Sequence, residues 1–471
     1  MKDILLVNPS ESYQENWGII SRFADKVPPL NLLYLLSFLH SKGFKGDIVD
    51  CNIEADPIKA VLKKIKEEKY SFVGFTTTTP LVHRIYELSD MIKKNYPDII
   101  QLAGGPHATF MSENFLENSQ IDFVVRGEGE NTLLELLQDK STSEINGLSY
   151  RRDTKIIHNP DREIIKDLNT LPIPEYELLP VEKYLPSVDT AKRLPVFHLM
   201  TSRGCPMKCI FCVGNLMFNK TWRMQSAARM AEECQMAAEK FGARQIRFID
   251  DNFVLNNKRV EEFSRLMIKK GLHKKLVWSC AARIDSVNQE ILPLMKEAGC
   301  FLVYFGIESG NEGILQKIDK KITKKQIREA TALTRRFGLE SRASFVIGLP
   351  TETKETVLET IEFARSLKLD YASFSIAVPY PGTELYEIAK RENRITTDKW
   401  DNYIQTVGFT KKSPVYCPPG IAEEDLKRLQ KYAFRRFYFY HWRVLRKIAA
   451  LRHKDEITRF FNILTKYILG L

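Results

Sequence analysis

The sequence predicts an α/β protein built from two successive sheets, and two observations support this prediction. Over the first 140 residues, short apolar runs alternate with helix-like stretches, which is typical of a parallel, doubly wound (Rossmann-like) sheet. From residue 194 to about 394 the alternation resumes with six strand candidates, which favours a partial (βα)6 barrel of the TIM type. A chain of 471 residues is too long for one ordinary domain. We expect an N-terminal domain, a connector, a barrel and a helical C-terminal extension at residues 1–140, 141–190, 191–395 and 396–471.

The N-terminal strands are apolar runs that each lead into a turn. They are expected at residues 4–7, 47–50, 72–76, 99–103 and 123–125, with helices at 30–42 and 57–69. In a doubly wound sheet the ligand binds beyond the carboxyl ends of the strands. Most residues at those ends are small, so a ligand can approach the backbone there. The candidates are Thr76, Thr77, Thr78, Gly104, Gly105, Glu128 and Gly129.

The connector is rich in proline and extended in character, and we expect an ordered crossover. The barrel strands that follow are expected at residues 196–200, 245–249, 276–280, 301–305, 341–347 and 371–378. Polar or Gly/Pro clusters come at the ends of strands two to six, where barrels of this type carry their chemistry. The candidates are Asp250, Asp251, Ser279, Arg283, Glu308, Gly348 and Glu352.

Three cysteines lie in one short loop after the first barrel strand. Cys205, Cys209 and Cys212 have the spacing C-x3-C-x2-C. Thiolates are the ligands of iron–sulfur clusters, whereas a zinc site usually has four ligands in two distant pairs. The other five cysteines are scattered, and eight cysteines are no disulfide framework at this length. Three thiolates on a four-iron cluster leave one iron open to bind another group.

This spacing, with Phe211 directly before the last cysteine, resembles the radical S-adenosylmethionine (SAM) superfamily. The resemblance implies a [4Fe-4S] cluster on the three cysteines, whose open iron binds SAM. One electron then cleaves SAM to methionine and a 5′-deoxyadenosyl radical. The resemblance places Asp250 and Asp251 at the SAM amino group.

The other SAM contacts are also implied by this resemblance. Ser279, Arg283 and Glu308 are candidates for the ribose and carboxylate of SAM, since arginine binds carboxylates through paired hydrogen bonds. The segment from Gly348 to Glu352 resembles the glycine motif that accommodates adenosine in the family.

Residues 1–140 resemble the cobalamin-binding domain that precedes many radical SAM barrels. The resemblance rests on the initial ILLVNP, the threonine run, the glycine pair and the RGEGE run at 126–130. It implies that cobalamin binds at the strand ends described above. The loop of residues 9–18 has no histidine, so we expect no histidine ligand on the lower face of cobalt. His40, His83 and His107 are expected to be surface or turn residues.

Together the resemblances imply a cobalamin-dependent radical SAM enzyme that methylates an unactivated carbon of a small molecule, with flavodoxin or ferredoxin as electron donor. The alternative is rearrangement, cyclisation or oxidation without methyl transfer, as in the anaerobic cyclase of bacteriochlorophyll synthesis. The residues do not separate these two. A methylthiotransferase would need three more cysteines near the N-terminus, where only Cys51 occurs. A non-catalytic cobalamin-binding module would leave the cysteine loop unexplained.

The net charge of +11 is concentrated at the C-terminus, where residues 431–471 hold ten Lys/Arg and two Asp/Glu among many aromatics. One interpretation is a helical lid on the barrel with solvated basic residues. The other is an amphipathic surface on anionic membrane, which would favour a lipid or isoprenoid substrate. No nucleic-acid readout motif occurs, so no nucleic-acid partner is expected. With no signal peptide and no long apolar window, we expect a cytoplasmic protein, at most peripheral at the inner membrane face.

Overall fold

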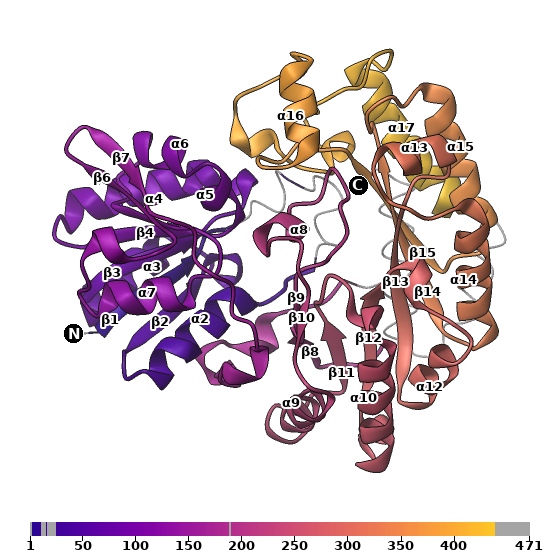
Figure 1. Ribbon diagram of the computed structural model, residues 1–471, viewed down its shortest axis with the longest axis horizontal. Coiled ribbons are helices and arrows are strands. Elements are labelled where there is room, and N and C mark those ends of the chain that lie inside the picture. The colour runs from indigo at the N-terminus through magenta and orange to yellow at the C-terminus, as the bar shows by residue number, and fades with distance from the viewer. Residues whose placement is uncertain (1, 11–15, 17–24, 188–189, 439–471) are drawn as a thin grey trace.

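The computed structural model describes residues 2–10, 16, 25–187 and 190–438, which form two sheet-based domains that pack against each other (Figure 1). The first domain is the indigo and purple part of the ribbon, and the barrel follows in red and orange. Most of the basic, aromatic tail discussed above lies outside the described residues, which end at Tyr438. Within the described residues, no helix is long and apolar enough to cross a membrane.

The first sheet has seven strands in the order β2-β1-β3-β4-β5-β6-β7. Their bounds are β1 Lys2–Asn8, β2 Gly46–Asp50, β3 Tyr70–Thr76, β4 Ile100–Gly104, β5 Phe123–Val125, β6 Leu148–Arg152 and β7 Lys155–His158. The first five are parallel, as predicted, and β6 and β7 add an antiparallel hairpin at one edge. The sheet therefore extends past the boundary expected at residue 140.

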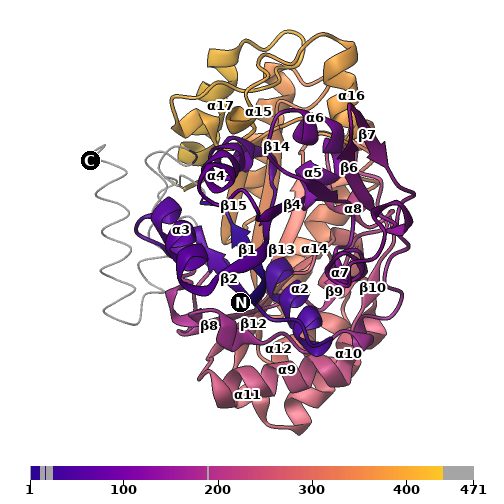
Figure 2. The same ribbon diagram turned by 90° about the vertical axis from the view of Figure 1, so that its left-hand side faces the viewer.

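Helices cover both faces of this sheet because both faces of its central strands are apolar. Leu5 and Val7 of β1 belong to one buried cluster, while Ile4 and Leu6 belong to another. Figure 2 shows α3 (Pro57–Glu68) and α4 (Val82–Asn95) on one side, and α2 (Leu30–Ser41) and α7 (Glu130–Leu137) on the other. Two short helices, α5 (Pro106–Phe110) and α6 (Ser112–Glu117), follow β4. The doubly wound prediction is confirmed.

The second sheet has six parallel strands in the order β15-β14-β13-β12-β11-β8. Their bounds are β8 Val196–Leu199, β11 Gln245–Phe248, β12 Val277–Ala282, β13 Cys300–Glu308, β14 Glu340–Ile347 and β15 Tyr371–Ile376. Among the described strands β8 and β15 stay unpaired with each other, so this is the partial (βα)6 barrel that the sequence predicts.

Helices surround this barrel, most of them on its outer face. They are α9 Ala227–Lys240, α10 Asn257–Lys269, α11 Leu272–Lys275, α12 Ile291–Glu297, α13 Glu312–Lys317, α14 Lys324–Arg336, α15 Lys354–Ser366, α16 Glu384–Arg391 and α17 Glu423–Tyr438. Residues 396–422 of the C-terminal extension hold only two short 3-10 turns, Trp400–Asn402 and Val407–Phe409. The helix α17 follows them and packs against the barrel, where the ring of Phe437 lies 6.1 Å from that of Phe374. This part of the extension is helical, as predicted.

The connector runs through three short 3-10 turns at Leu168–Thr170, Tyr176–Leu178 and Val181–Lys183. It is held to the barrel by Arg229 on α9, whose guanidinium donates to four of its backbone carbonyls. The connector is therefore ordered, because its backbone groups have fixed partners.

Candidate active site

The three cysteines lie in a loop closed at its base by a short antiparallel pair, β9 (Ser202–Arg203) and β10 (Arg223–Met224). Cys209 is buried, and Cys205 and Cys212 are half-buried. Burial raises the pKa of each thiol. Backbone N–H groups oppose this effect at Cys205 and Cys212, since they stabilise the thiolate.

This donor set fits a multi-iron cluster. The three thiols lie on one loop and are close enough to influence each other's charge. Thiolates are the ligands of iron–sulfur clusters, in which each thiolate binds a different iron.

Asp250 fixes the start of the cysteine loop. Its carboxylate accepts hydrogen bonds from the backbone N–H and hydroxyl of Thr201 and from the hydroxyl of Ser202. Arg259 donates to the Thr201 carbonyl from the other side, at 3.1 Å. Asp250 is 3% exposed, and its bonds all point back into the loop. The structure thus gives Asp250 a supporting contact to the start of the cysteine loop.

Asp251 is the acidic residue that faces the loop. It is exposed, and a Cβ built on Gly214 would lie 3.3 Å from its carboxylate, just beyond Cys212. The structure therefore separates two adjacent aspartates that the sequence analysis placed together.

Two buried cations lie beside the cysteine loop. Lys320 forms an ion pair with Glu308 at 2.9 Å, and Arg283 forms a paired contact with Asp285 at 2.9 Å for both bonds. Arg283 also donates to the Lys320 carbonyl at 3.0 Å, which ties the two cations together. Burial raises the pKa of Cys209, and the charges of Lys320 and Arg283 counteract it. Lys320 was not predicted from the sequence, because one lysine among several after α13 carries no pattern.

Glu352 holds the turn after β14 from within. Its carboxylate accepts from the backbone N–H groups of Gly348 at 2.6 Å and Leu349 at 3.0 Å. Glu352 is 0% exposed, and burial raises its pKa to about 8. Its side chain therefore shapes the turn without lining an open site.

The barrel interior is polar. Along β14 and β15, every second residue packs into the apolar core beneath the helices, for example Phe345 and Phe374. The intervening residues face the interior, and they are mostly polar or small: Arg342, Ser344, Tyr371, Ser373 and Ser375. Closed barrels usually fill this space with Val, Ile and Leu. This interior is instead suited to a polar molecule.

At the buried floor of this interior, the hydroxyl of Ser279 has no partner among the described residues. Above it, Ser344 donates to Glu308 at 3.4 Å. Of the predicted residues, Arg283 and Glu308 thus lie beside the cysteine loop, whereas Ser279 lies deeper in the barrel.

The strand ends of the first domain are built differently. Thr77 joins two strands, because its hydroxyl donates to the Gly104 carbonyl at 2.8 Å and accepts from the Ala108 N–H at 2.9 Å. Thr76 accepts from Asn31 at 2.8 Å. Gly105 has φ +99°, and a Cβ there would lie 2.9 Å from the Thr77 carbonyl. The exposed Thr78 and the half-buried glycines leave backbone accessible to a large flat ligand, which fits cobalamin.

Glu128, predicted for cobalamin, has its carboxylate oxygens paired with Arg203 and Arg223 of the barrel. We therefore assign Glu128 to the contact between the domains. Of the three histidines, His83 is exposed and His40 pairs with Glu175. His107, in contrast, is 1% exposed, and burial lowers its pKa to about 3.

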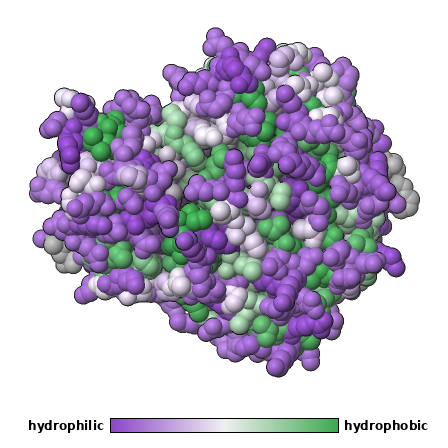
Figure 3. All heavy atoms as spheres, in the orientation of Figure 1, coloured by the Kyte–Doolittle hydropathy of each residue, from purple (hydrophilic) through white to green (hydrophobic). Residues whose placement is uncertain are grey.

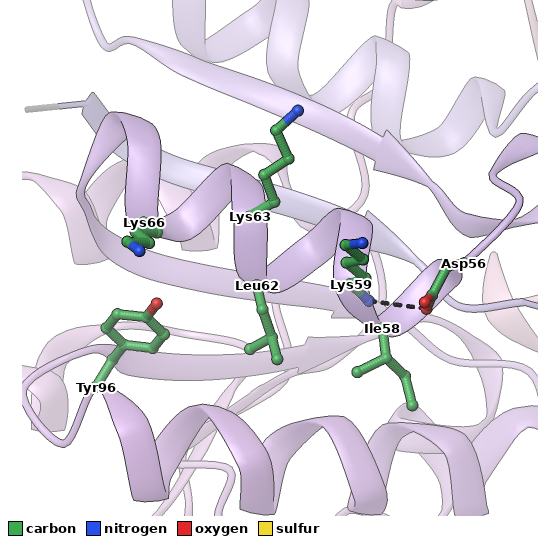
Figure 4. A pocket seen from close by; sticks show the side chains of 7 residues that line it. All are labelled: Asp56, Ile58, Lys59, Leu62, Lys63, Lys66 and Tyr96. Atoms are coloured by element: carbon green, nitrogen blue, oxygen red, sulfur yellow. Dashed lines mark hydrogen bonds between the residues drawn. The ribbon is translucent and has the colours of Figure 1, made fainter.

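A shallow hollow of about 540 Å³ lies along α3 of the first domain (Figure 4). It is lined by Asp56, Ile58, Lys59, Leu62, Lys63, Lys66 and Tyr96. None of the candidate residues lines it. On the face of the molecule drawn in Figure 3, apolar residues lie in the middle, between the domains and around α8 (Gly214–Met217) of the cysteine loop.

Comparison with known proteins agrees with the division of the chain into a first, doubly wound domain and a barrel. A family model described as "B12 binding domain" matches residues 16–137, and "Radical SAM superfamily" matches residues 199–364. The chain is 38% identical to the uncharacterized methyltransferase PH0819 of Pyrococcus horikoshii, over 93% of this chain and 92% of that protein. It is 27% identical to the anaerobic magnesium-protoporphyrin IX monomethyl ester cyclase of Rubrivivax gelatinosus, over 89% of this chain and 75% of that one.

Two solved structures share the fold. The methyltransferase TsrM from Kitasatospora setae, with cobalamin and a [4Fe-4S] cluster bound, has a TM-score of 0.72 at 18% identity, covering 92% of this chain and 91% of that one. OxsB, with aqua-cobalamin and SAM bound, has a TM-score of 0.72 at 17% identity, covering 99% and 71%. The chain belongs to the cobalamin-binding radical SAM enzymes, whose cofactors are cobalamin, a [4Fe-4S] cluster and S-adenosylmethionine.

Proposed function

We propose that this enzyme transfers a methyl group to an unactivated carbon of a small polar molecule. One observation carries the proposal: the strand ends of the cobalamin-binding domain abut the base of the cysteine loop, through the ion pair between Glu128 and Arg203 at 2.7 Å. When bound, the cofactors supply a carbon-centred radical and a methyl donor. The methyltransferase name of the relative with 38% identity supports the same reaction.

The residues fall into three proposed roles. Cys205, Cys209 and Cys212 hold the cluster. Arg283 orients the SAM carboxylate, with Asp251, Glu308 and Lys320 as neighbouring polar contacts and the backbone at Gly348 beside adenosine. Thr76, Thr78, Gly104, Gly105 and Gly129 line the cobalamin site. Arg283 uses Nε and Nη2 on Asp285, and the remaining Nη1 of its buried guanidinium is the physical basis for this role, since a charged donor binds carboxylates strongly.

The proposed substrate class follows from the barrel interior. Arg342 and Arg247 both lie on the ring of Tyr304, at 5.5 and 5.6 Å from its centroid, and serines lie above them. Burying an isoprenoid chain against these charged and polar groups would remove water from them, which costs free energy. We therefore propose a polar substrate.

From the strand bounds, we also propose that the cobalamin-binding domain spans residues 2–158 and that the barrel begins at residue 196.

Cyclisation or rearrangement without methyl transfer is the second candidate, because relatives at 25–27% identity are anaerobic cyclases. The test is an oxygen-free incubation of the cofactor-loaded enzyme with reductant, cell extract and SAM that carries a CD3 group. Methyl transfer produces a metabolite about 17 Da heavier, because CD3 replaces hydrogen. Substrate-dependent 5′-deoxyadenosine without labelled product would refute methylation and support cyclisation.

Two variants control this assay. Cys209→Ala should abolish 5′-deoxyadenosine formation, because it removes a cluster ligand. Cys417→Ala, which changes a half-buried cysteine outside the loop, should retain it. Equal loss in both variants would contradict the proposed cluster site.

A further inference from the structure

Four charged side chains are buried where the two domains meet. Glu128 and Glu130 follow β5 in the cobalamin-binding domain, and Arg203 and Arg223 lie on β9 and β10 of the barrel. Arg203 pairs with Glu128 at 2.7 Å and with Glu130 at 2.6 Å, while Arg223 pairs with the second oxygen of Glu128 at 2.8 Å. Their side chains are 4–8% exposed. We call these four residues the interdomain charge cluster.

The cluster is anchored on several sides. The backbone N–H of Ile165 donates to Glu128 at 2.8 Å, and Arg223 donates to the backbone carbonyl of Ile165 at 2.5 Å. Arg203 lies over the ring of Tyr34 on α2, at 5.6 Å from its centroid. The neighbouring arginines hold the pKa of Glu128 below its usual value, although burial alone would raise it. Glu128 is therefore a buried carboxylate whose charge depends on its partners.

Arg203 and Arg223 lie opposite each other in the β9–β10 hairpin, so closing this hairpin requires the charge of Glu128. Arg203 and Arg223 are direct cross-strand partners in the β9–β10 pair, at the two ends of the loop that carries the cysteines. Like charges directly opposite each other destabilise a strand pair. Glu128 offsets this repulsion, because it accepts from both guanidinium groups. The first domain thus supplies the counter-charge that closes the base of the cysteine loop.

The same acidic residues border the proposed cobalamin site. Gly127 and Gly129 flank Glu128, and a Cβ at Gly127 would meet nothing within 4 Å, so this turn has space on its outer side. Glu130 begins α7, which packs on the sheet. A ligand that seats against this turn would therefore restrain Glu128 and Glu130, and through them both ends of the cysteine loop.

We propose that Glu128, Glu130, Arg203 and Arg223 are positioning residues that transmit cobalamin binding in the first domain to the cysteine loop of the barrel. The proposal rests on the placement of cobalamin under Proposed function. It goes beyond that placement, because it makes the order of the cysteine loop depend on whether the first domain is loaded.

Hydrogen exchange of the full-length, cluster-loaded protein tests this coupling without any turnover. Exchange of the amides at residues 204–222 is measured by mass spectrometry without and with hydroxocobalamin, whose binding is followed by its absorbance. We expect cobalamin to slow exchange in this loop by about threefold or more. In Glu128→Gln, which retains one acceptor oxygen but loses the charge, the slowing should disappear.

A matched control and a second variant keep the test decisive. Glu135→Gln changes a carboxylate on the same helix α7 whose partners are Arg162 and Lys140, both outside the cluster, and should respond like the unmodified protein. If Glu128→Gln does not fold, Glu130→Gln loses only one pair and should reduce the response by about half. If Glu128 and Glu130 had a merely structural role, their variants would have a changed melting temperature, while hydroxocobalamin would still slow amide exchange in the cysteine loop.

The outcomes separate the two proposals. If hydroxocobalamin binds and exchange in the loop does not change, or if Glu128→Gln responds fully, the coupling is overturned while the proposed function stands. If the unmodified protein binds no hydroxocobalamin, the proposed cobalamin site and the coupling are both overturned.

Discussion

Replacing Glu352 by glutamine should stabilise this enzyme at alkaline pH. The carboxyl is fully buried, one of its oxygens accepts two backbone hydrogen bonds, and the other has no partner among the described residues. Burial raises its pKa from 4.5 to about 8. Between these values the folded state binds more protons than the unfolded state, so the free energy of unfolding falls as pH rises.

The size of the effect follows from this rise in the pKa of Glu352. Each pKa unit corresponds to about 1.4 kcal/mol, so ionising Glu352 in place lowers the free energy of unfolding by about 4–5 kcal/mol at pH 9 relative to pH 4.5. Glutamine retains an oxygen for the two N–H donors and has no charge to desolvate. Glu352→Gln should therefore lose this part of the pH dependence.

The assay is urea unfolding followed by circular dichroism at pH 5.5, 7 and 9. The midpoint of Glu352→Gln should exceed that of the parent protein slightly at pH 5.5 and by a larger margin at pH 9. Glu355→Gln is the control, because this carboxylate is exposed at the start of α15, and its midpoints should stay near those of the parent. Parallel pH profiles for Glu352→Gln and the parent would refute the reasoning.

Three further substitutions test other contacts. Lys320→Met leaves Glu308 buried without its ion-pair partner and should lower the free energy of unfolding in urea by about 3–5 kcal/mol. Adding Glu308→Gln to the same protein should restore part of this loss, and no recovery would contradict the pairing. Asp250→Ala leaves the buried donors at the start of the cysteine loop unmet, which should cost about 2–3 kcal/mol and lower the iron bound per chain. Gly348→Ala should cost about 1–3 kcal/mol, because φ is +79° and its Cβ would lie 2.9 Å from Leu426. A melting temperature equal to that of the parent would contradict this strain.

The sequence predicted the strands and the cysteine loop well, because both signals are local. An apolar run of strand length predicted residues 341–347, and β14 spans Glu340–Ile347. The hairpin β6–β7 was missed, although Asp153 and Thr154 join two short strands. The sequence signal for this turn was Asp153. It adopts φ +55°, a conformation that aspartate tolerates in tight hairpin turns.

The side-chain assignments could not be completed from the sequence, since an acidic residue at a strand end has the same pattern whatever it contacts. Asp250 and Asp251 are adjacent, yet one supports Thr201 and the other faces Gly214. Glu352 sits in a motif expected to face adenosine, and its carboxylate bonds to the backbone of its own turn. The partner of a buried carboxylate is decided by packing between distant segments, which local periodicity does not contain.

The interdomain charge cluster shows why the two domains have to be considered together. Arg203 and Arg223 are unremarkable in sequence, and only the β9–β10 register brings them opposite each other. Two cofactors on different domains react only when held at a defined separation and orientation. Buried, directional ion pairs permit few separations and orientations of the two domains. A barrel without its first domain would keep all three cysteines and lose Glu128, so its two arginines would face each other without a counter-charge. The geometry of the cysteine loop is therefore a property of both domains.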